Sequence, residues 1–111
     1  MDHFKVRWQL TDNSAKGLVA RPQDRTETAR VLVESFGGKL HHYYFSFGEY
    51  DGVGICEFPD NTAVAAFSMA AASMGAFSRF ETMALLTGKD AEAAMKRAHE
   101  TKTTGYKPPN A

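Results

Sequence analysis

Residues 48–60 read GEYDGVGICEFPD, and this stretch decides the fold because it encodes a turn, a strand and a helix start in succession. Gly48 and Asp51-Gly52 are typical of a tight turn between two antiparallel strands. The residues from Gly52 to Phe58 predict the second of those strands. Pro59-Asp60 then indicates the amino end of a helix, where proline loses no useful donor and an acidic side chain is favourable.

The turn predicts an exposed hairpin tip that carries Glu49, Tyr50 and Asp51. Turn chemistry alone explains Asp51, and Tyr50 can serve only to cover the edge of the core. Hairpin tips also hold binding sites, so Glu49 and Tyr50 are candidate ligand-binding residues. Both interpretations stay open at this point.

Periodicity on either side of this stretch predicts the remaining elements. Alternation of apolar and polar residues favours strands over 4–10, 39–47 and 77–86, in addition to 52–58. Helical spacing favours helices over 24–36, 60–74 and 87–99. Residues 11–23 lack either pattern, and we expect a connection there that carries one short helical turn or acts as a lid.

The order of these elements predicts an α+β fold of the ferredoxin-like βαββαβ type. Such a fold has a four-stranded antiparallel sheet with two helices on one face, and here an additional C-terminal helix follows. We expect one domain over residues 1–99, because 111 residues suit a single core. Residues 100–111 have little apolar surface and are expected to form a flexible tail.

The sheet face without helices would expose aromatic and aliphatic side chains from two strands. Either Tyr43, Phe45 and Phe47 or the opposite set of His42 and Tyr44 lies on it, together with Met83 and Leu85. This would leave an apolar patch too large for a typical monomer. A second copy of the chain packed on this face would cover it. We therefore expect a homodimer or higher oligomer of the dimeric α+β-barrel type.

Composition excludes several classes of function. The chain has 13 basic and 13 acidic residues and is 43% hydrophobic, which favours neither disorder nor binding to nucleic acid. No stretch reaches the ~18 apolar residues that a membrane span requires, so no membrane partner is expected. The single cysteine, Cys56, fits a reducing, cytoplasmic setting.

The chain resembles the GYD family of small bacterial and archaeal domains. The resemblance spans residues 4–87. Its motifs are Gly37-Gly38-Lys39, Gly48-Glu49-Tyr50-Asp51, Glu57 with Pro59-Asp60, and the strand end from Thr82 to Thr87. It implies a ferredoxin-like, dimeric α+β-barrel architecture and no particular activity. Gly52 and Gly54 stand where larger aliphatic residues are more common in the family, and they either leave room beside the strand or loosen it.

The aromatic and histidine run in the second strand supplies candidate catalytic residues. His42 with Tyr44, or His41 with Tyr43, would provide an acid and an orienting hydroxyl on one face of a cavity. Adjacent residues of a regular strand point to opposite faces, so the two histidines are not expected to share one metal ion. Hydrogen-bonded structural histidines are the alternative.

Two carboxylates and one arginine complete the candidate ligand-binding residues. Glu57 ends a strand before a helix, while Glu81 and Arg79 share one face of the fourth strand. Burial would raise the pKa of either carboxyl and make it a base, whereas ion pairing with Lys5, Arg7 or Arg79 is the simpler account. No phosphate loop, nucleophile elbow or zinc spacing is present, so no metal and no cofactor are expected.

Three functions remain open from the sequence. The favoured one is a homo-oligomeric binding or accessory domain whose cavity takes a small organic molecule. The second is a cofactor-independent enzyme, such as a monooxygenase or isomerase, that uses His41 or His42. The third is a structural assembly module.

Overall fold

The structure, a computed structural model, describes residues 1–110 and has the element order β1-α1-α2-β2-β3-α3-β4-α4. The strands are β1 (Asp2–Leu10), β2 (Lys39–Phe45), β3 (Gly52–Phe58) and β4 (Phe77–Leu85). The helices are α1 (Asp12–Ala20), α2 (Thr26–Ser35), α3 (Asn61–Ser73) and α4 (Gly88–Glu100).

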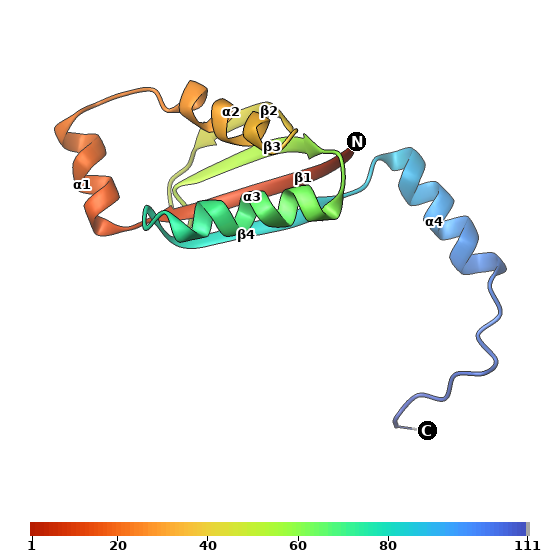
Figure 1. The fold of residues 1–111 in the computed structure, drawn as a ribbon. Helices are drawn as coiled ribbons and strands as arrows, with labels where there is room; N and C mark the ends of the chain where they lie inside the picture. The colour runs from red at the N-terminus through yellow and green to blue at the C-terminus, as the bar shows by residue number, and fades with distance from the viewer. Residues whose placement is uncertain (111) are drawn as a thin grey trace.

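The four strands form one antiparallel sheet in the order β2-β3-β1-β4. Helices α2 and α3 lie side by side on one face of this sheet (Figure 1). The opposite face, which we call the open face, is covered by no helix of residues 1–110. This arrangement confirms the α+β, ferredoxin-like fold with two helices on one face.

The core fills the space between the sheet and the helices α2 and α3. Inward-facing positions alternate along β1 and β3, as the sequence pattern predicts for strands with one buried face. The buried cluster is Phe4, Val6, Trp8, Val33, Cys56, Phe58, Val64 and Phe67. Because α2 and α3 each contribute to this cluster, their burial holds both helices against the sheet.

Gly52 is required by the packing of Trp8 rather than by a turn. The two residues are paired across β1 and β3, and a Cβ at Gly52 would overlap the indole ring. A Cβ added at Gly38 would likewise lie only 2.7 Å from the ring of Phe58. The sequence left two explanations for Gly52, which either leaves room beside the strand or loosens it. The structure supports the first, because Gly52 leaves room for the Trp8 indole.

Residues 12–20 form a full helix, where the sequence predicted a connection with at most one short turn. Thr11 caps this helix α1, because its side chain accepts a hydrogen bond from the Ser14 amide at 3.2 Å. No residue of α1 is buried. The helix therefore forms from local capping and propensity while its weak apolar pattern leaves it without a place in the core.

A β-bulge in β2 changes the direction of its histidines. Leu40 pairs with Cys56 and His42 pairs with Ile55, so His41 is the extra residue between them. The side chain of His41 reaches Glu57, and His42 stacks on Tyr44, both on the open face. The expectation that adjacent histidines point to opposite faces is wrong here, because it assumed a regular strand.

Helix α4 projects away from the sheet and has no buried residue (Figure 1). Thr87 caps it by accepting a hydrogen bond from the Asp90 amide at 3.0 Å. The radius of gyration is 18.1 Å, whereas a compact chain of this length has about 13 Å. Residues 101–110 form no helix or strand.

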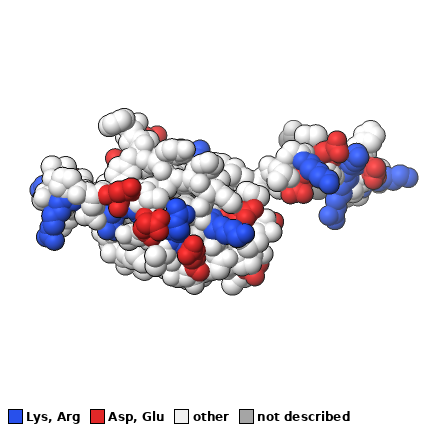
Figure 2. Space-filling model, turned by 90° about the horizontal axis from the view of Figure 1, so that it is seen from above, with Lys and Arg blue, Asp and Glu red and all other residues white. Residues whose placement is uncertain are grey.

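Charges of both signs are intermixed on the surface. Figure 2 shows basic and acidic side chains side by side over the body of the molecule and again on α4. This distribution agrees with equal numbers of basic and acidic residues in the chain. Within residues 1–110, every helix is too short or too polar to cross a lipid bilayer.

Candidate functional site

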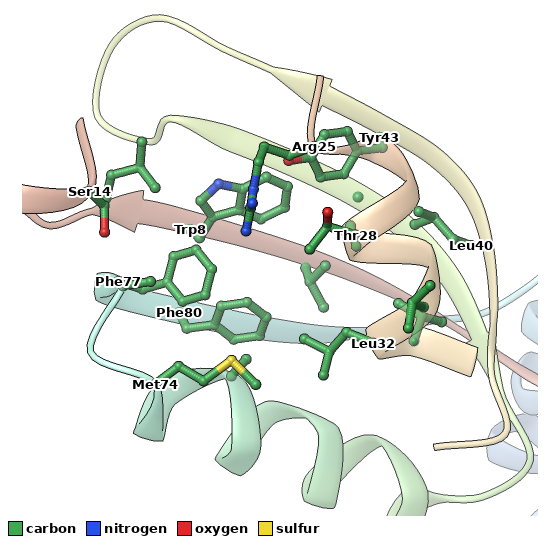
Figure 3. A pocket seen from close by; sticks show the side chains of 18 of the residues that line it. Trp8, Ser14, Arg25, Thr28, Leu32, Leu40, Tyr43, Met74, Phe77 and Phe80 are labelled. Atoms are coloured by element: carbon green, nitrogen blue, oxygen red, sulfur yellow. The ribbon is translucent and has the colours of Figure 1, made fainter. Parts of the chain in front are cut away.

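A cavity of about 620 Å³ lies between the sheet and the helices α1, α2 and α3. Its floor is aromatic, with Trp8 stacked on Tyr43 at a centroid distance of 5.4 Å and Phe77 packed on Phe80. Leu32 of α2 lines the other side (Figure 3). The volume falls within the ~300–1,000 Å³ range of small-molecule sites. We call this space the apolar cavity.

The lining of the apolar cavity is mostly apolar, with a small number of polar side chains. Arg25 and Thr28 are two of these polar residues (Figure 3). The Arg25 guanidinium donates a hydrogen bond to the Gln23 side chain at 3.0 Å and has no carboxylate partner within residues 1–110. Burial raises the pKa of the Tyr43 hydroxyl, against the opposing charge of Arg25. A cation thus lies beside an aromatic wall.

The turn between β2 and β3 folds back along β1 on the open face, while Glu49 stays exposed as the sequence predicts. The Asp51 amide donates to the Trp8 carbonyl at 2.8 Å, and the Asp51 carboxylate accepts from the Leu10 amide at 2.7 Å. Tyr50 is only 8% exposed. The predicted exposed tip is therefore wrong for Tyr50, because the turn folds back along β1.

Tyr50 and Glu81 form the centre of a charged network on the open face. The Tyr50 hydroxyl donates to Glu81 Oε1 at 2.6 Å, and Arg7 Nε donates to Glu81 Oε2 at 2.7 Å. Arg79 bridges Glu81 at 3.1 Å and Glu49 at 3.2 Å. We call these residues the Tyr50 network. Three elements that are distant in sequence, β1, the turn and β4, are tied together by it.

The Tyr50 network also includes a cation–π contact and two groups with shifted pKa values. The Arg7 guanidinium lies 4.0 Å from the centroid of the Tyr50 ring. Hydrogen bonds from Tyr50 and Arg7 lower the pKa of Glu81, and the hydrogen bond to Glu81 raises the pKa of Tyr50. Glu81 is thus held as a carboxylate and paired, which is the simpler of the two accounts considered from the sequence.

Glu57 lies within ion-pair distance of two histidines at the other end of the open face. His3 Nε2 lies 2.8 Å from Glu57 Oε1, and His41 Nε2 lies 3.3 Å from Glu57 Oε2. The two imidazole rings stack at a centroid distance of 6.0 Å. Burial acts to raise the pKa of Glu57, but the hydrogen bond from His41 and the nearby histidine charges outweigh it, so that pKa is lowered.

The candidate catalytic residues of β2 are divided between the two faces of the sheet. Tyr43 lines the apolar cavity, and no histidine does so. His41, His42 and Tyr44 lie on the open face, where the ring of His42 stacks on Tyr44 at 6.1 Å. The pairing of His41 with Tyr43 is not formed. The pairing of His42 with Tyr44 is formed and remains a prediction for catalysis.

Several residues of these sites were not identified from the sequence. Arg25, Thr28 and His3 were not singled out as site residues. A usable signal existed for His3, since antiparallel pairing of β1 with β3 places it opposite Glu57. Arg25 carried no comparable signal, because its place in the lining of the apolar cavity depends on the path of the connection from α1 to α2.

Cys56 is part of the core and not of a site. It is fully buried, and burial raises the pKa of its thiol to about 11. Its Sγ lies 3.8 Å from the Phe4 carbonyl. The thiol therefore stays protonated near neutral pH.

Comparison with known proteins supports the fold and the family. The chain is similar to a solved structure described as the crystal structure of FFRP-DM1, with a TM-score of 0.50 and 15% identity over 78% of this chain and 100% of that chain. That similarity concerns the fold alone. A search among curated proteins found no match. The family model for the GYD domain matches residues 4–95, and the chain therefore belongs to the GYD domain family.

Proposed function

We propose that this GYD domain binds a small, largely apolar organic molecule with an acidic group in the apolar cavity. The observation that carries the proposal is the 620 Å³ space itself, with aromatic rings as its floor and Arg25 in its lining. Apolar walls favour burial of a hydrocarbon or aromatic body, and a cation without a carboxylate partner favours a carboxylate or sulfonate head.

Helix α1 supports the proposal by offering a route of entry. Ser14, Gly17 and Leu18 of this helix line the apolar cavity, although no residue of α1 is buried. An element with so little packing opens at low free-energy cost. Movement of α1 would admit a ligand without disturbing the core beneath α2 and α3.

The test uses the fluorescence of Trp8, the only tryptophan in the chain and part of the cavity floor. Titration with decanoate and with anilinonaphthalene sulfonate should change this fluorescence in a saturable manner. Thr28→Phe, which fills the cavity, and Arg25→Gln, which removes the cation, should each weaken binding by about tenfold, or ~1.4 kcal/mol.

Arg97→Gln is the matched control, since it removes one arginine from the exposed helix α4 and should leave both titrations unchanged. Absence of a saturable change with either probe would contradict the proposal. Equal loss of affinity in Arg25→Gln and Arg97→Gln would show a nonspecific charge effect and contradict the role of Arg25.

We further propose that two copies of the chain pack through their open faces. Tyr44 is 60% exposed and Met83 is 49% exposed on this face, and Val53 and Ile55 lie between them half-buried. Covering these side chains would remove apolar surface from water. The ion pairs of the Tyr50 network would then lie at the same interface.

A further inference from the structure

We propose that His3, His41 and Glu57 form a binding site for one divalent first-row transition-metal ion, for which Zn²⁺ is the probe. The three side chains come from β1, β2 and β3 and meet on the open face. One potential ligand atom from each lies within 4.8 Å of the others. The proposal is independent of the apolar cavity, which lies on the opposite face of the sheet.

The backbone explains why these three side chains meet. His3 and Glu57 are directly opposed in the antiparallel pairing of β1 with β3, so their side chains share one face. The bulge in β2 then turns His41 toward the same carboxylate, which a regular strand would not do. Two independent features of the sheet thus converge on Glu57.

The distances fit a single ion. Metal–ligand bonds of about 2.0–2.2 Å place neighbouring ligand atoms roughly 3 Å apart in tetrahedral or octahedral geometry. His3 Nε2 lies 2.8 Å from Glu57 Oε1 and His41 Nε2 lies 3.3 Å from Glu57 Oε2, so one ion would bind both carboxylate oxygens, or the carboxylate would turn to present one oxygen to it. Both histidine side chains are exposed enough to turn toward a common ion, at 36% for His3 and 41% for His41.

The donor types select the class of metal. Imidazole nitrogen suits Zn²⁺, Fe²⁺, Ni²⁺ and Cu²⁺, whereas Ca²⁺ and Mg²⁺ prefer sites built of oxygen. Each neutral imidazole would carry its proton on Nδ1 and present the Nε2 lone pair to the ion, in place of the Nε2–H bond to Glu57. Three protein ligands leave further coordination positions for water or a substrate.

The surroundings favour an ion that is only partly enclosed. Glu57 is 19% exposed, so its charge is partly shielded from water while the histidines remain accessible. The alternative is a structural cluster in which the two histidines only pair with Glu57. A measurement of metal binding separates these two interpretations directly.

The experiment titrates tag-free, chelator-treated protein with Zn²⁺ in a calorimeter and with Co²⁺ in a visible-absorption cell. We expect one ion per chain with a micromolar or tighter dissociation constant, and a ligand-field band for Co²⁺. His3→Ala, His41→Ala and Glu57→Gln should each weaken binding by at least about tenfold. All variants are compared at the same oligomeric mass, measured by light scattering.

The two remaining histidines provide matched controls. His42→Ala lies next to the site on β2 and His99→Ala lies on α4, and both should bind Zn²⁺ as the parent does. The proposal is overturned if the parent binds no Zn²⁺, or if a control variant loses as much affinity as His41→Ala. Because His3 and His41 are partly exposed, their alanine variants should fold, and thermal unfolding without metal checks this.

Discussion

At the scale of single residues, Gly52 shows how closely the sheet is matched to the only tryptophan. The Trp8 indole occupies the space in which any side chain at position 52 would begin. Glycine at this position lets Trp8 lie flat against the strand and form the floor of the apolar cavity. The residue thus connects the packing of the core with the proposed binding site.

Gly52→Ala is expected to lower the free energy of unfolding by about 1–3 kcal/mol, the usual cost of overpacking. Urea unfolding followed by circular dichroism measures this change. Gly17→Ala is the matched control, because nothing lies within 4 Å of its hypothetical Cβ and helical alanine is favoured over glycine by up to about 1 kcal/mol. Equal stability of the parent and Gly52→Ala would contradict the steric argument.

Glu81 predicts a pH dependence of stability. Its pKa is lowered in the folded chain, so its stabilising effect is complete above the pKa of the unfolded chain and is lost as the pH falls through the folded pKa. The stability difference between the parent and Glu81→Gln should therefore be largest near neutral pH and shrink below about pH 4.3. Chemical unfolding across this acidic range tests the expectation.

The control for Glu81 is Glu34→Gln, an exposed position on α2 in no ion pair within residues 1–110. The stability difference between the parent and Glu34→Gln should vary less with pH than the difference for Glu81→Gln. A stability difference for Glu81→Gln that stays constant down to strongly acidic pH would contradict the role of the carboxylate. The pKa of Tyr50 is raised in the folded chain, so its effect on stability has the opposite pH dependence. Its stabilising contribution is lost as the pH rises through the folded pKa of Tyr50.

At the scale of elements, α1 and the bulge in β2 account for most of what the sequence pattern missed. A nine-residue helix without a buried residue leaves almost no apolar period, so α1 resembled a loop. The bulge leaves no compositional sign, since it arises from how β2 and β3 align. Both features nevertheless shape a proposed site, α1 for the apolar cavity and the bulge for the histidine cluster.

The remaining elements were predicted because each has a strong local signal. β3 spans Gly52–Phe58 as expected, and Asp60 caps α3 by accepting a hydrogen bond from the Ala63 amide at 2.8 Å. Gly37 follows α2 with a φ of 77°, a left-handed conformation that glycine adopts without strain. Caps, glycine stops and alternation are local properties, so a single sequence reveals them.

At the scale of the whole molecule, two apolar surfaces lack a cover within residues 1–110. One is the open face, and the other is the stripe on α4 that includes Met95, which is 68% exposed. A projecting helix and an uncovered sheet face on the same chain are compatible with a partner that covers both. A second copy of the chain is the partner that we propose.

Light scattering at micromolar concentration should give twice the chain mass of 12.2 kDa. Tyr44→Glu places a charge at the middle of the open face and should shift the protein toward the monomer, because burying an unpaired charge is costly. Met69→Glu is the control, since Met69 is exposed on α3 on the other side of the sheet. A parent that remains monomeric would contradict the dimer.

The sequence by itself determined the strands, the main helices, their caps and the ferredoxin-like order, because these follow from periodicity and local hydrogen bonding. It also identified Glu49, Tyr50, Glu57, Arg79 and Glu81 as residues worth attention. Only the tertiary structure decided their roles. It placed Tyr50 against Arg7 and Glu81, brought His3 and His41 to Glu57, and put Arg25 in the lining of the apolar cavity. These contacts depend on strand register, a bulge and the path of a connection, which arise from packing between segments distant in the chain.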